Sequence, residues 1–303
     1  MAINLKPADF IYPYFVRGGI NKKEPIKNFF DVYRFSKDRL IRNIDKIRVL
    51  GLNKILLFGI PEKKDAVGNG AMAKDNVVVS AVKMIKKEFS DLVVMTDVCL
   101  CAYITHGHCG IIKSQANIDN KKTLNVLAKI ALRHAEAGAD WVAPSAMAQG
   151  QVREIRKALD KNGFKKTKIM GYSAKFASNF YGPFRQAASS TPKFGDRSGY
   201  QLAFADGRKA LREINDDIRE GADMVMVKPA LSYLDVIKEA RLKFDYPLAA
   251  YNVSGEYAFV KYGAKTGLWD EKEMVFEILT SIKRSGADLI ISYHAKDMAK
   301  WLT

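Results

Sequence analysis

Short apolar segments of strand length alternate with segments of helical periodicity along the whole chain. Eight of these segments have the length and composition expected of buried strands. They cover residues 11–15, 55–58, 92–96, 141–143, 168–172, 224–227, 248–251 and 289–292. Alternation of this kind favours a parallel sheet whose strands are connected by helices. The pattern therefore predicts an α/β fold, a TIM (β/α)8 barrel.

The segments between the strands have one apolar face each. Ser36 can cap the first predicted helix and Gly51 can end it. The apolar positions of that helix recur at helical spacing, at Leu40, Ile41, Ile44, Ile47 and Leu50. Similar helices are predicted after Asn76 and over residues 123–137, 152–159, 208–219, 234–244 and 274–284.

The tripeptide Gly-Ala-Asp precedes three of the predicted strands. Its glycine can end the preceding helix in the left-handed conformation. Five residues after each aspartate lies a polar side chain, namely Ser145, Lys228 or Tyr293. Barrels of this type carry their chemistry at the carboxyl ends of the strands. Three polar residues in the same register favour a site at that end over ordinary loop residues.

The composition is that of a compact protein, with 48% apolar and 27% charged residues in a chain of 303. Because barrels of this kind commonly need about 250 residues, we expect one catalytic domain over residues 1–303. The chain starts without a secretion signal, and no apolar run approaches the roughly 18 residues of a membrane span. A cytoplasmic protein with no membrane partner is expected.

The chain is strongly basic, with 49 Lys and Arg against 33 Asp and Glu and a formal charge of +16. Such a balance can indicate nucleic acid, an acidic membrane surface or small anionic substrates. The basic residues are spread along the whole chain, and no aromatic RNA-binding motif accompanies them. A solvated basic surface with no nucleic-acid partner is therefore expected.

All three cysteines lie in one loop after the third predicted strand. The spacing is Cys99-x-Cys101 followed by Cys109, and thiolates so arranged suit a zinc ion. Three ligands leave one position open, as in catalytic zinc sites. Two alternatives remain. One is a disulfide, which geometry and a reducing compartment disfavour; the other is a fourth ligand from His106 or His108, which would make the site structural.

Two lysines lie in apolar contexts at neighbouring strand ends. Lys228 follows Met-Val-Met-Val, and Lys175 lies in Tyr-Ser-Ala-Lys-Phe-Ala-Ser just after the fifth strand. Burial and a nearby second cation both lower the pKa of a lysine, which makes its amine available to attack a carbonyl group. The alternative is a pair of surface lysines with extended side chains.

These segments together resemble the porphobilinogen synthase family, also called the δ-aminolevulinic acid dehydratases, over nearly the whole chain. The matching segments are Phe-Ile-Tyr-Pro-Tyr-Phe-Val from Phe10, Asp-Val-Cys-Leu-Cys from Asp97, Thr-His-Gly-His-Cys-Gly from Thr105, Val-Ala-Pro-Ser from Val142, Tyr-Ser-Ala-Lys-Phe-Ala-Ser from Tyr172, Phe-Tyr-Gly-Pro-Phe-Arg to Arg185, Lys-Phe-Gly-Asp-Arg to Arg197, Met-Val-Lys-Pro at Lys228, Val-Ser-Gly-Glu at Ser254 and Ser-Tyr at Tyr293. The resemblance implies a hydro-lyase that condenses two molecules of 5-aminolevulinate to porphobilinogen, with loss of water, in heme biosynthesis.

The resemblance also implies roles for the lysines and the metal. Lys228 is expected to hold the substrate of the propionate side as an imine, and Lys175 to bind the ketone of the acetate-side substrate. Asp97 is the expected proton-handling partner. The chain carries cysteines where magnesium-only members carry aspartates, which implies zinc as the cofactor on Cys99, Cys101 and Cys109.

The two substrate carboxylates are assigned by the same resemblance. Arg185 and Arg197 are expected to hold the acetate-side carboxylate, because guanidinium groups match carboxylate geometry. Ser254 and Tyr293 are expected to hold the other. Residues 178–199 resemble the family's active-site lid, which would exclude water from the imines.

Regulation and assembly are less closely matched. Family members form homo-oligomers with a longer amino-terminal arm than the short arm expected here over residues 1–10, so self-association is expected without the octamer being implied. Glu213 aligns with an allosteric magnesium ligand of some relatives, so Mg²⁺ is a second candidate cofactor. The simpler interpretation of Glu213 is an exposed helix acid.

Two other functions remain as alternatives. A Schiff-base aldolase on the same barrel would explain one lysine, but it would leave the cysteine loop and the second lysine without a role. A basic nucleic-acid-binding protein with structural zinc would bind with an affinity that falls steeply with salt, and it would have a closed four-ligand site.

Overall fold

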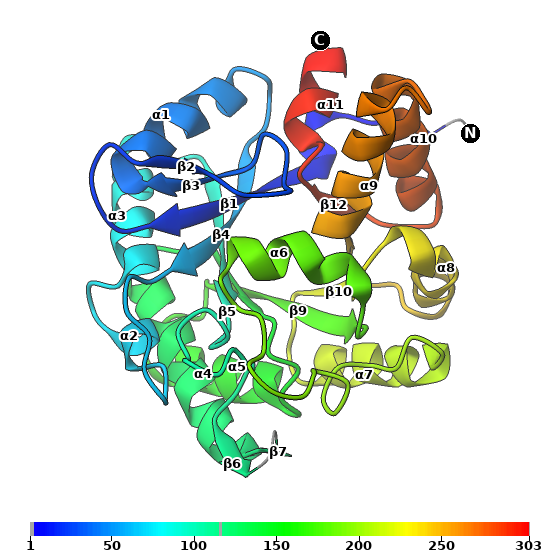
Figure 1. Cartoon of the computed structure of the whole chain (residues 1–303). Helices are drawn as coiled ribbons and strands as arrows, with labels where there is room; N and C mark the ends of the chain where they lie inside the picture. The colour runs from blue at the N-terminus through cyan, green and yellow to red at the C-terminus, as the bar shows by residue number, and fades with distance from the viewer. Residues whose placement is uncertain (1–2, 115–116, 303) are drawn as a thin grey trace.

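Eight parallel strands form a closed barrel in the computed structural model, which describes residues 3–114 and 117–302 (Figure 1). The barrel strands are β1 (Phe10–Arg17), β4 (Lys54–Ile60), β5 (Val93–Val98), β8 (Trp141–Pro144), β9 (Lys168–Lys175), β10 (Met224–Lys228), β11 (Leu248–Asn252) and β12 (Leu289–Ser292). They pair in that order, and β12 pairs with β1 to close the ring. The eight predicted strands and the (β/α)8 fold class are confirmed.

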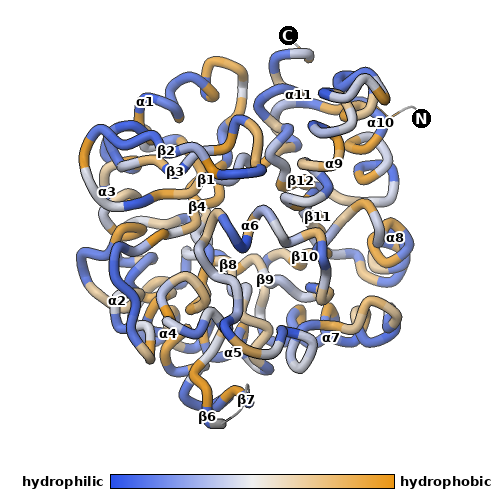
Figure 2. Tube along the Cα trace, in the orientation of Figure 1, coloured by the Kyte–Doolittle hydropathy of each residue, from blue (hydrophilic) through white to orange (hydrophobic). Residues whose placement is uncertain are grey.

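Helices surround the barrel, and Figure 2 shows polar and apolar residues alternating along them. They are α1 (Lys37–Arg48), α2 (Asn69–Met72), α3 (Val77–Glu88), α4 (Asn120–Glu136), α5 (Gln151–Lys161), α7 (Gly207–Arg219), α8 (Leu234–Lys243), α9 (Ser254–Lys265), α10 (Glu271–Arg284) and α11 (Ala295–Leu302). The Asn76 side chain caps α3 by accepting hydrogen bonds from two backbone N–H groups. The capping role expected of Ser36 is wrong, because its hydroxyl bonds to Lys22 and Asp38 instead.

Alternate residues of each barrel strand pack on the two faces of the barrel wall. In β1, Phe10, Tyr12 and Tyr14 belong to the core between strands and helices, whereas Ile11 and Phe15 belong to the core inside the barrel. The alternation follows from the two-residue period of a strand. Full burial of a large apolar side chain stabilises a fold by about 1.5–3 kcal/mol, so both cores contribute to the stability of the barrel.

The Gly-Ala-Asp segments connect helices to strands as their glycines predict. Gly138, Gly221 and Gly286 all have positive φ angles. The aspartates have a role that the pattern did not suggest. Asp140, Asp223 and Asp288 each accept a hydrogen bond of 2.8 Å from the backbone N–H of Val94, Ile169 and Leu248, respectively, near the start of the neighbouring strand. Each segment therefore ends a helix and also ties two barrel strands together.

Other elements were not predicted. A hairpin of β2 (Lys23–Pro25) and β3 (Tyr33–Ser36) extends the sheet beside β1, and β6 (Ile112–Ser114) pairs with β7 (Asn117–Ile118). The short helix α6 (Gly182–Ala187) lies over the middle of the ring of strands in Figure 1. Of the arm expected over 1–10, residues 1–2 lie outside the described residues. In the described part of the chain, no helix is long and apolar enough to cross a membrane.

Candidate active site

The two lysines singled out from the sequence lie side by side at the carboxyl ends of neighbouring strands. Lys175 ends β9, Lys228 ends β10, and the two residues are register partners. Their Nζ atoms lie 5.6 and 5.1 Å from the centroid of the same ring, that of Tyr172. Only 5% of Lys175 and 4% of Lys228 is exposed. The surface-lysine alternative is therefore wrong.

A β-bulge in β9 directs Lys175 into the barrel. Val225 and Val227 of β10 are two residues apart. Their partners in β9, Gly171 and Ala174, are three residues apart. In a regular strand Tyr172 and Lys175, which are three positions apart, would face opposite sides of the sheet. The extra residue brings both side chains to the inner face, as bulges near active sites commonly do.

The amine of Lys228 lies among aromatic rings. Its Nζ is 4.1 Å from the centroid of Tyr251 and 5.2 and 5.1 Å from those of Tyr181 and Phe184. Burial and then the neighbouring charge of Lys175 hold the pKa of Lys228 well below its ordinary value. The geometry thus favours the free amine, which is the nucleophilic form.

Lys175 and Asp97 are buried polar neighbours of Lys228. The Lys175 Nζ donates to the Ser145 carbonyl oxygen at 2.5 Å, across the gap between β9 and the end of β8. Asp97, near the end of β5, has a pKa raised to about 6 by burial, although Ser145 and both lysines favour its charged form. One of its carboxylate oxygens is buried without a hydrogen-bond partner.

The three cysteines converge beside Lys175. Cys99, Cys101 and Cys109 are buried and free, and their sulfur atoms lie within 4.8 Å of one another. Hydrogen bonds from the other two thiols, together with the charges of Arg197 and Lys175, hold the pKa of Cys109 well below its ordinary value. The disulfide alternative is wrong for this structure. Buried sulfurs at this spacing, one of them favoured as a thiolate, fit a soft cation such as zinc.

The histidines of the loop point to other partners. His108 has Nε2 at 2.9 Å from the Phe194 carbonyl oxygen and Nδ1 at 3.3 Å from the Tyr200 hydroxyl. His106 accepts the backbone N–H of His108 at 3.1 Å. Within residues 3–114 and 117–302, no histidine or carboxylate joins the cysteine cluster at the 4.8 Å spacing. The geometry therefore favours three ligands over a closed structural site.

A second cluster of ligand-type residues differs in its charge balance. Glu271, His294 and Asp297 also lie within 4.8 Å of one another. Both carboxylates, however, already bind the Lys261 ammonium, at 2.5 and 3.0 Å. This internal cation makes the group an ion-pair network, so the cysteine cluster is the stronger candidate for a metal.

Two arginines lie close to each other and have unused donors, and one of them, Arg197, also binds the cysteine loop. Arg197 is 4% exposed and donates to the Gly107 and Ser190 carbonyl oxygens at 2.9 and 2.6 Å. Burial and the charge of Arg197 lower the pKa of Arg185. The Nε atoms of both guanidiniums are buried without a partner. Two adjacent cations with unused donors form a site for a carboxylate.

Ser254 and Tyr293 are hydrogen-bonded to residues whose aromatic rings surround the Lys228 amine. The Tyr293 hydroxyl is 3.1 Å from that of Tyr251, whose ring contacts the Lys228 amine. The Ser254 hydroxyl accepts the Phe184 N–H at 3.0 Å and donates to the Phe180 carbonyl oxygen at 3.1 Å. Tyr293 therefore reaches Lys228 through Tyr251, and Ser254 through Phe184, whose ring lies 5.1 Å from the Lys228 amine.

Residues 178–199 lie beside the lysines and the cysteine loop. They include the 3-10 turn Asn179–Tyr181 and α6, and they touch both the cysteine loop and α9. Two glycines permit this close approach. A Cβ on Gly107 would lie 2.5 Å from the Thr191 carbonyl oxygen, and one on Gly255 would lie 2.5 Å from the Phe180 carbonyl oxygen. The segment occupies the position that a lid requires.

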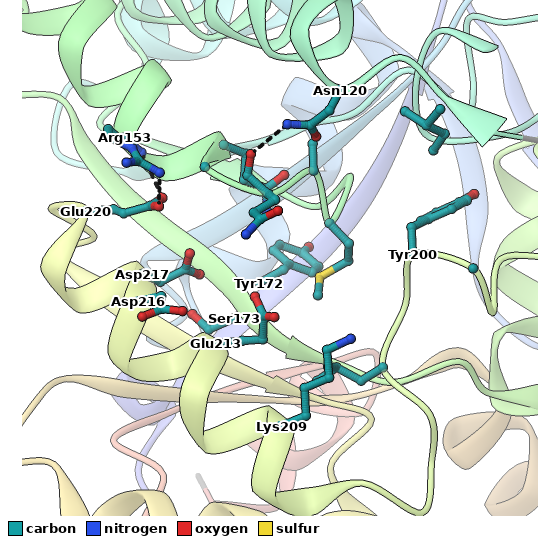
Figure 3. A pocket seen from close by; sticks show the side chains of 18 of the residues that line it. Asn120, Arg153, Tyr172, Ser173, Tyr200, Lys209, Glu213, Asp216, Asp217 and Glu220 are labelled. Atoms are coloured by element: carbon teal, nitrogen blue, oxygen red, sulfur yellow. Dashed lines mark hydrogen bonds and ion pairs between the residues drawn. The ribbon is translucent and has the colours of Figure 1, made fainter. Parts of the chain in front are cut away.

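Glu213 faces an acidic cavity of about 840 Å³ between α5 and α7, which Tyr172 also lines (Figure 3). It is half-buried, so the interpretation as an exposed acid is wrong. Asp216, Asp217 and Glu220 of the same region line the cavity with it. Burial raises the pKa of Asp217 to about 7. The Arg153 guanidinium binds Glu220 at 2.8 Å. The other carboxylates of the cavity, those of Glu213, Asp216 and Asp217, offer oxygen ligands that suit a hard cation.

Two residues of the site were missed by the sequence analysis. Gln201 lies one turn after Arg197, is 3% exposed, and has both amide atoms without a partner. Tyr172 lies under both lysine amines, and its buried hydroxyl is also unpartnered. The four-residue spacing from Arg197 was a signal for Gln201. Tyr172 could not have been found without the bulge.

Comparisons with known proteins agree with this geometry. A family model described as delta-aminolevulinic acid dehydratase matches residues 1–301. The delta-aminolevulinic acid dehydratase of Archaeoglobus fulgidus is 51% identical over 298 residues, covering 98% of this chain and 92% of that protein. The one from Bacillus subtilis is 50% identical with the same coverage. A crystal structure of the Toxoplasma gondii enzyme in complex with the reaction product porphobilinogen has a TM-score of 0.96 and 40% identity, and covers 98% of this chain and 86% of that one.

Proposed function

This chain belongs to the delta-aminolevulinic acid dehydratase family, and from its cavity we propose which residues carry the family's reaction. The protein is a hydro-lyase that condenses two molecules of 5-aminolevulinate to porphobilinogen, with loss of water, in tetrapyrrole biosynthesis. The aldolase and nucleic-acid alternatives are therefore set aside. The observation that carries the residue assignment is the pair of buried lysines on adjacent strand ends.

Lys228 is proposed to form the first imine. Its free amine attacks the ketone carbon of the propionate-side substrate, and the ketone oxygen leaves as water after proton transfer. The lowered pKa of Lys228 supports this role, because a protonated amine has no lone pair for the attack. The surrounding aromatic rings favour the cationic imine that results.

Lys175 and Asp97 are proposed to act on the acetate-side substrate. Lys175 is the register partner of Lys228 on the adjacent strand, so two ketones bound on these amines would lie next to each other. Holding two reactants together supplies much of the rate of a bimolecular condensation. Asp97, with a pKa near neutrality, is suited to accept and return protons between them.

The carboxylates of the two substrates are proposed to be bound at opposite ends of the cavity. Arg185 and Arg197 take the acetate-side carboxylate, and Gln201 adds an amide donor on the same turn. Unpartnered buried donors support this assignment, because each would otherwise remain unsatisfied. Ser254 and Tyr293 take the carboxylate of the substrate on Lys228. Distinct carboxylate sites orient two identical molecules in different roles.

The family is metal-dependent, and Cys99, Cys101 and Cys109 are proposed to hold a zinc ion. Their burial, their mutual distances and the absence of a disulfide support this proposal. A zinc ion with an open position supplies Lewis-acid chemistry to bound oxygen and nitrogen groups. Three reduced thiols also suit a reducing compartment, and we propose the cytoplasm.

The acidic cavity at Glu213 is proposed to bind Mg²⁺ as a regulator. Mg²⁺ usually keeps several waters and uses one or two carboxylates, which an 840 Å³ cavity can accommodate. We expect Mg²⁺ to stimulate the wild-type enzyme and not the Glu213→Gln variant. Turnover measured over a magnesium titration checks this, with Glu239→Gln on exposed α8 as the matched control. Equal stimulation of all three proteins would contradict the site.

Self-association into a homo-oligomer is also proposed. Large apolar side chains on and after α9 are exposed, namely Phe259, Tyr262 and Leu268 at 57%, 43% and 71%. An exposed patch of this kind commonly marks a protein contact. Sedimentation of the purified chain would give the number of copies, and a monomer at all concentrations would contradict the proposal.

The reaction itself is tested by supplying 5-aminolevulinate to the zinc-loaded protein. A pyrrole that colours with an acidic aldehyde reagent is expected. The control substrate is 4-oxopentanoate, which keeps the ketone and the carboxylate but lacks the amine needed for the pyrrole nitrogen. Absence of colour with 5-aminolevulinate, or equal colour with both compounds, would overturn the assignment.

A further inference from the structure

The β2–β3 hairpin touches the lid through one arginine. Arg34 of β3 donates from Nε to the Ala187 carbonyl oxygen and from an Nη atom to that of Gln186, both at 2.7 Å. These two carbonyls belong to the last residues of α6. Carbonyl groups at a helix end lack intrahelical partners and carry partial negative charge. The Gln186 carbonyl oxygen also accepts the Ser189 N–H at 3.1 Å, so the Arg34 guanidinium adds a bond there and binds Ala187 as well.

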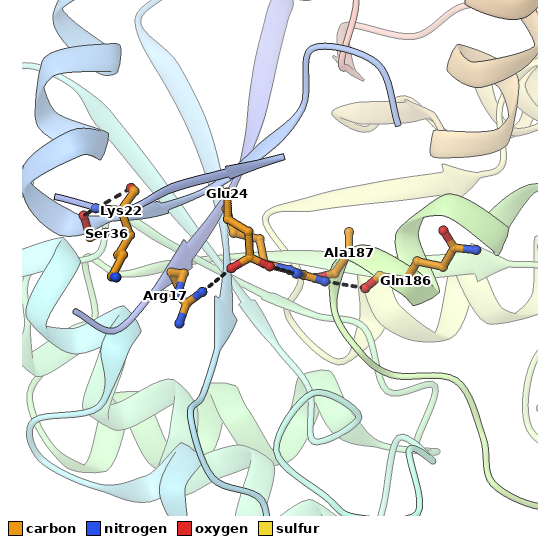
Figure 4. A network of polar contacts seen from close by, with 7 residues as sticks. Arg17, Lys22, Glu24, Ser36, Gln186 and Ala187 are labelled. Atoms are coloured by element: carbon orange, nitrogen blue, oxygen red, sulfur yellow. Dashed lines mark hydrogen bonds and ion pairs between the residues drawn. The ribbon is translucent and has the colours of Figure 1, made fainter. Parts of the chain in front are cut away.

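Glu24 fixes the orientation of this guanidinium. It forms ion pairs with both Arg34 and Arg17, so that the contacts run from β1 through Glu24 and Arg34 to the lid (Figure 4). The Arg34 side chain is 16% exposed, whereas that of Arg17 is 31% exposed and is not hydrogen-bonded to the lid. The planar Arg34 guanidinium donates charge-assisted hydrogen bonds, which are stronger and more directional than hydrogen bonds between neutral groups.

The hairpin itself is anchored in the mouth of the barrel. Phe29, between its two strands, is 2% exposed and lies 4.6 Å from the Tyr293 ring and 5.6 Å from the Tyr257 ring, measured between centroids. Such aromatic packing makes the hairpin a firm support. Arg34 thus connects a packed element to a segment that must open for substrate to enter.

Neighbouring carbonyls of the lid are held in the same way. The Ser189 carbonyl oxygen accepts a hydrogen bond from Lys64, and that of Ser190 accepts one from Arg197. Residues 186–190 therefore offer four carbonyl oxygens to three cations from separate parts of the chain. The Ser190 N–H donates to the Arg185 carbonyl oxygen at 2.9 Å, which ties the backbone of Arg185 to this stretch.

We propose that Arg34, oriented by Glu24, is a positioning residue that holds the lid closed over bound substrate. It contacts no substrate and acts through the backbone of α6, which places Arg185 at the carboxylate site. The inference rests on the proposed role of Arg185 and of the lid. Closure of this kind excludes water and completes the binding site.

The test compares Arg34→Ala with the matched control Arg17→Ala, which removes the other partner of the same Glu24. Amide hydrogen exchange is measured without substrate at Ala188 and Ser190, whose N–H groups bond within the lid. Loss of two charge-assisted bonds is expected to speed exchange at these amides about tenfold in Arg34→Ala. Arg17→Ala should leave it unchanged.

Kinetics provide the second readout. In Arg34→Ala, KM for 5-aminolevulinate is expected to rise about five- to tenfold while kcat falls less, because excess substrate restores the closed population. Arg34→Lys keeps the positive charge but loses the planar guanidinium. Its KM should lie between those of the wild-type protein and Arg34→Ala. Should Arg34→Ala fail to fold, Arg34→Lys carries the comparison.

Three outcomes would overturn the proposal. One is unchanged exchange at the lid amides in Arg34→Ala, a second is an equal effect of Arg17→Ala, and a third is faster exchange of barrel and lid alike, which would indicate a general loss of stability. Hydrogen exchange does not require turnover. A failure of the proposed reaction would therefore appear in the activity assay of the wild-type protein, and a failure of the lid proposal would appear in the exchange rates.

Discussion

Replacing Lys228 by alanine is expected to reduce turnover by at least about 10⁴-fold, the order observed when the nucleophile of a covalent catalyst is removed. Among the residues that the structure describes, Lys175 at the neighbouring strand end is the only other lysine over one of the rings around Lys228, that of Tyr172. The barrel should stay folded, because the substitution removes a polar amine whose burial is unfavourable. Assay of porphobilinogen formation and thermal unfolding by circular dichroism check both parts.

Trapping identifies the nucleophile directly. Borohydride added with limiting 5-aminolevulinate should leave the substrate's mass on Lys228 in the wild-type protein. Because the pKa of Lys228 is lowered, its amine stays unprotonated at pH values well below the ordinary lysine pKa, and trapping should persist there. Lys168→Ala is the matched control, since Lys168 begins the strand that Lys175 ends. Label on another lysine, or turnover by Lys228→Ala, would reassign the chemistry.

Loss of a cysteine of the cluster is the second large effect. Cys101→Ala is expected to lower both zinc content and turnover by at least about 100-fold, since even outer partners of a metal ligand contribute 10–100-fold. With three cysteines in the cluster, removal of one leaves only two protein ligands for the metal. Metal analysis of the purified variant and its activity under added zinc measure the two effects separately.

His106→Ala is the control for this prediction. Its ring bonds to the His108 backbone and lies outside the cysteine cluster. We therefore expect this variant to keep its zinc. Chelation of the wild-type protein should abolish turnover, and zinc should restore it. A zinc-depleted His106 variant would point to a four-ligand structural site, and full activity after verified metal removal would rule out a role for the metal.

Both predictions depend on local sequence patterns that could be interpreted without coordinates. The cysteines are neighbours in the chain, so a single loop of about ten residues brings them together whatever surrounds it. Lys228 directly follows four apolar residues of a buried strand, which places it at a strand end. Short-range patterns of this kind can be interpreted from the sequence because chain connectivity alone limits where their residues can lie.

Local sequence patterns do not predict the contacts of the lid. Its sequence is rich in small and aromatic residues, but the partners of its backbone are Arg34, Lys64 and Arg197. Arg34 is about 150 positions away from the carbonyls that it binds. Among 49 basic residues, no local signal marks one as the partner of a distant helix end. The same holds for Glu213, whose half-buried position depends on the packing of α7 beside β9.

The order of strands and helices, the positions of the strand ends and the clustering of thiols follow from periodicity and spacing, because each depends on residues within one segment. The side of the barrel wall on which Lys175 lies depends on one extra residue in β9, which only the pairing with β10 reveals. Closure of the barrel then brings Asp97, Lys175, Lys228 and Arg197 close to one another. Contacts between distant segments depend on how the strands pair and the helices pack, and a linear pattern does not encode that arrangement locally.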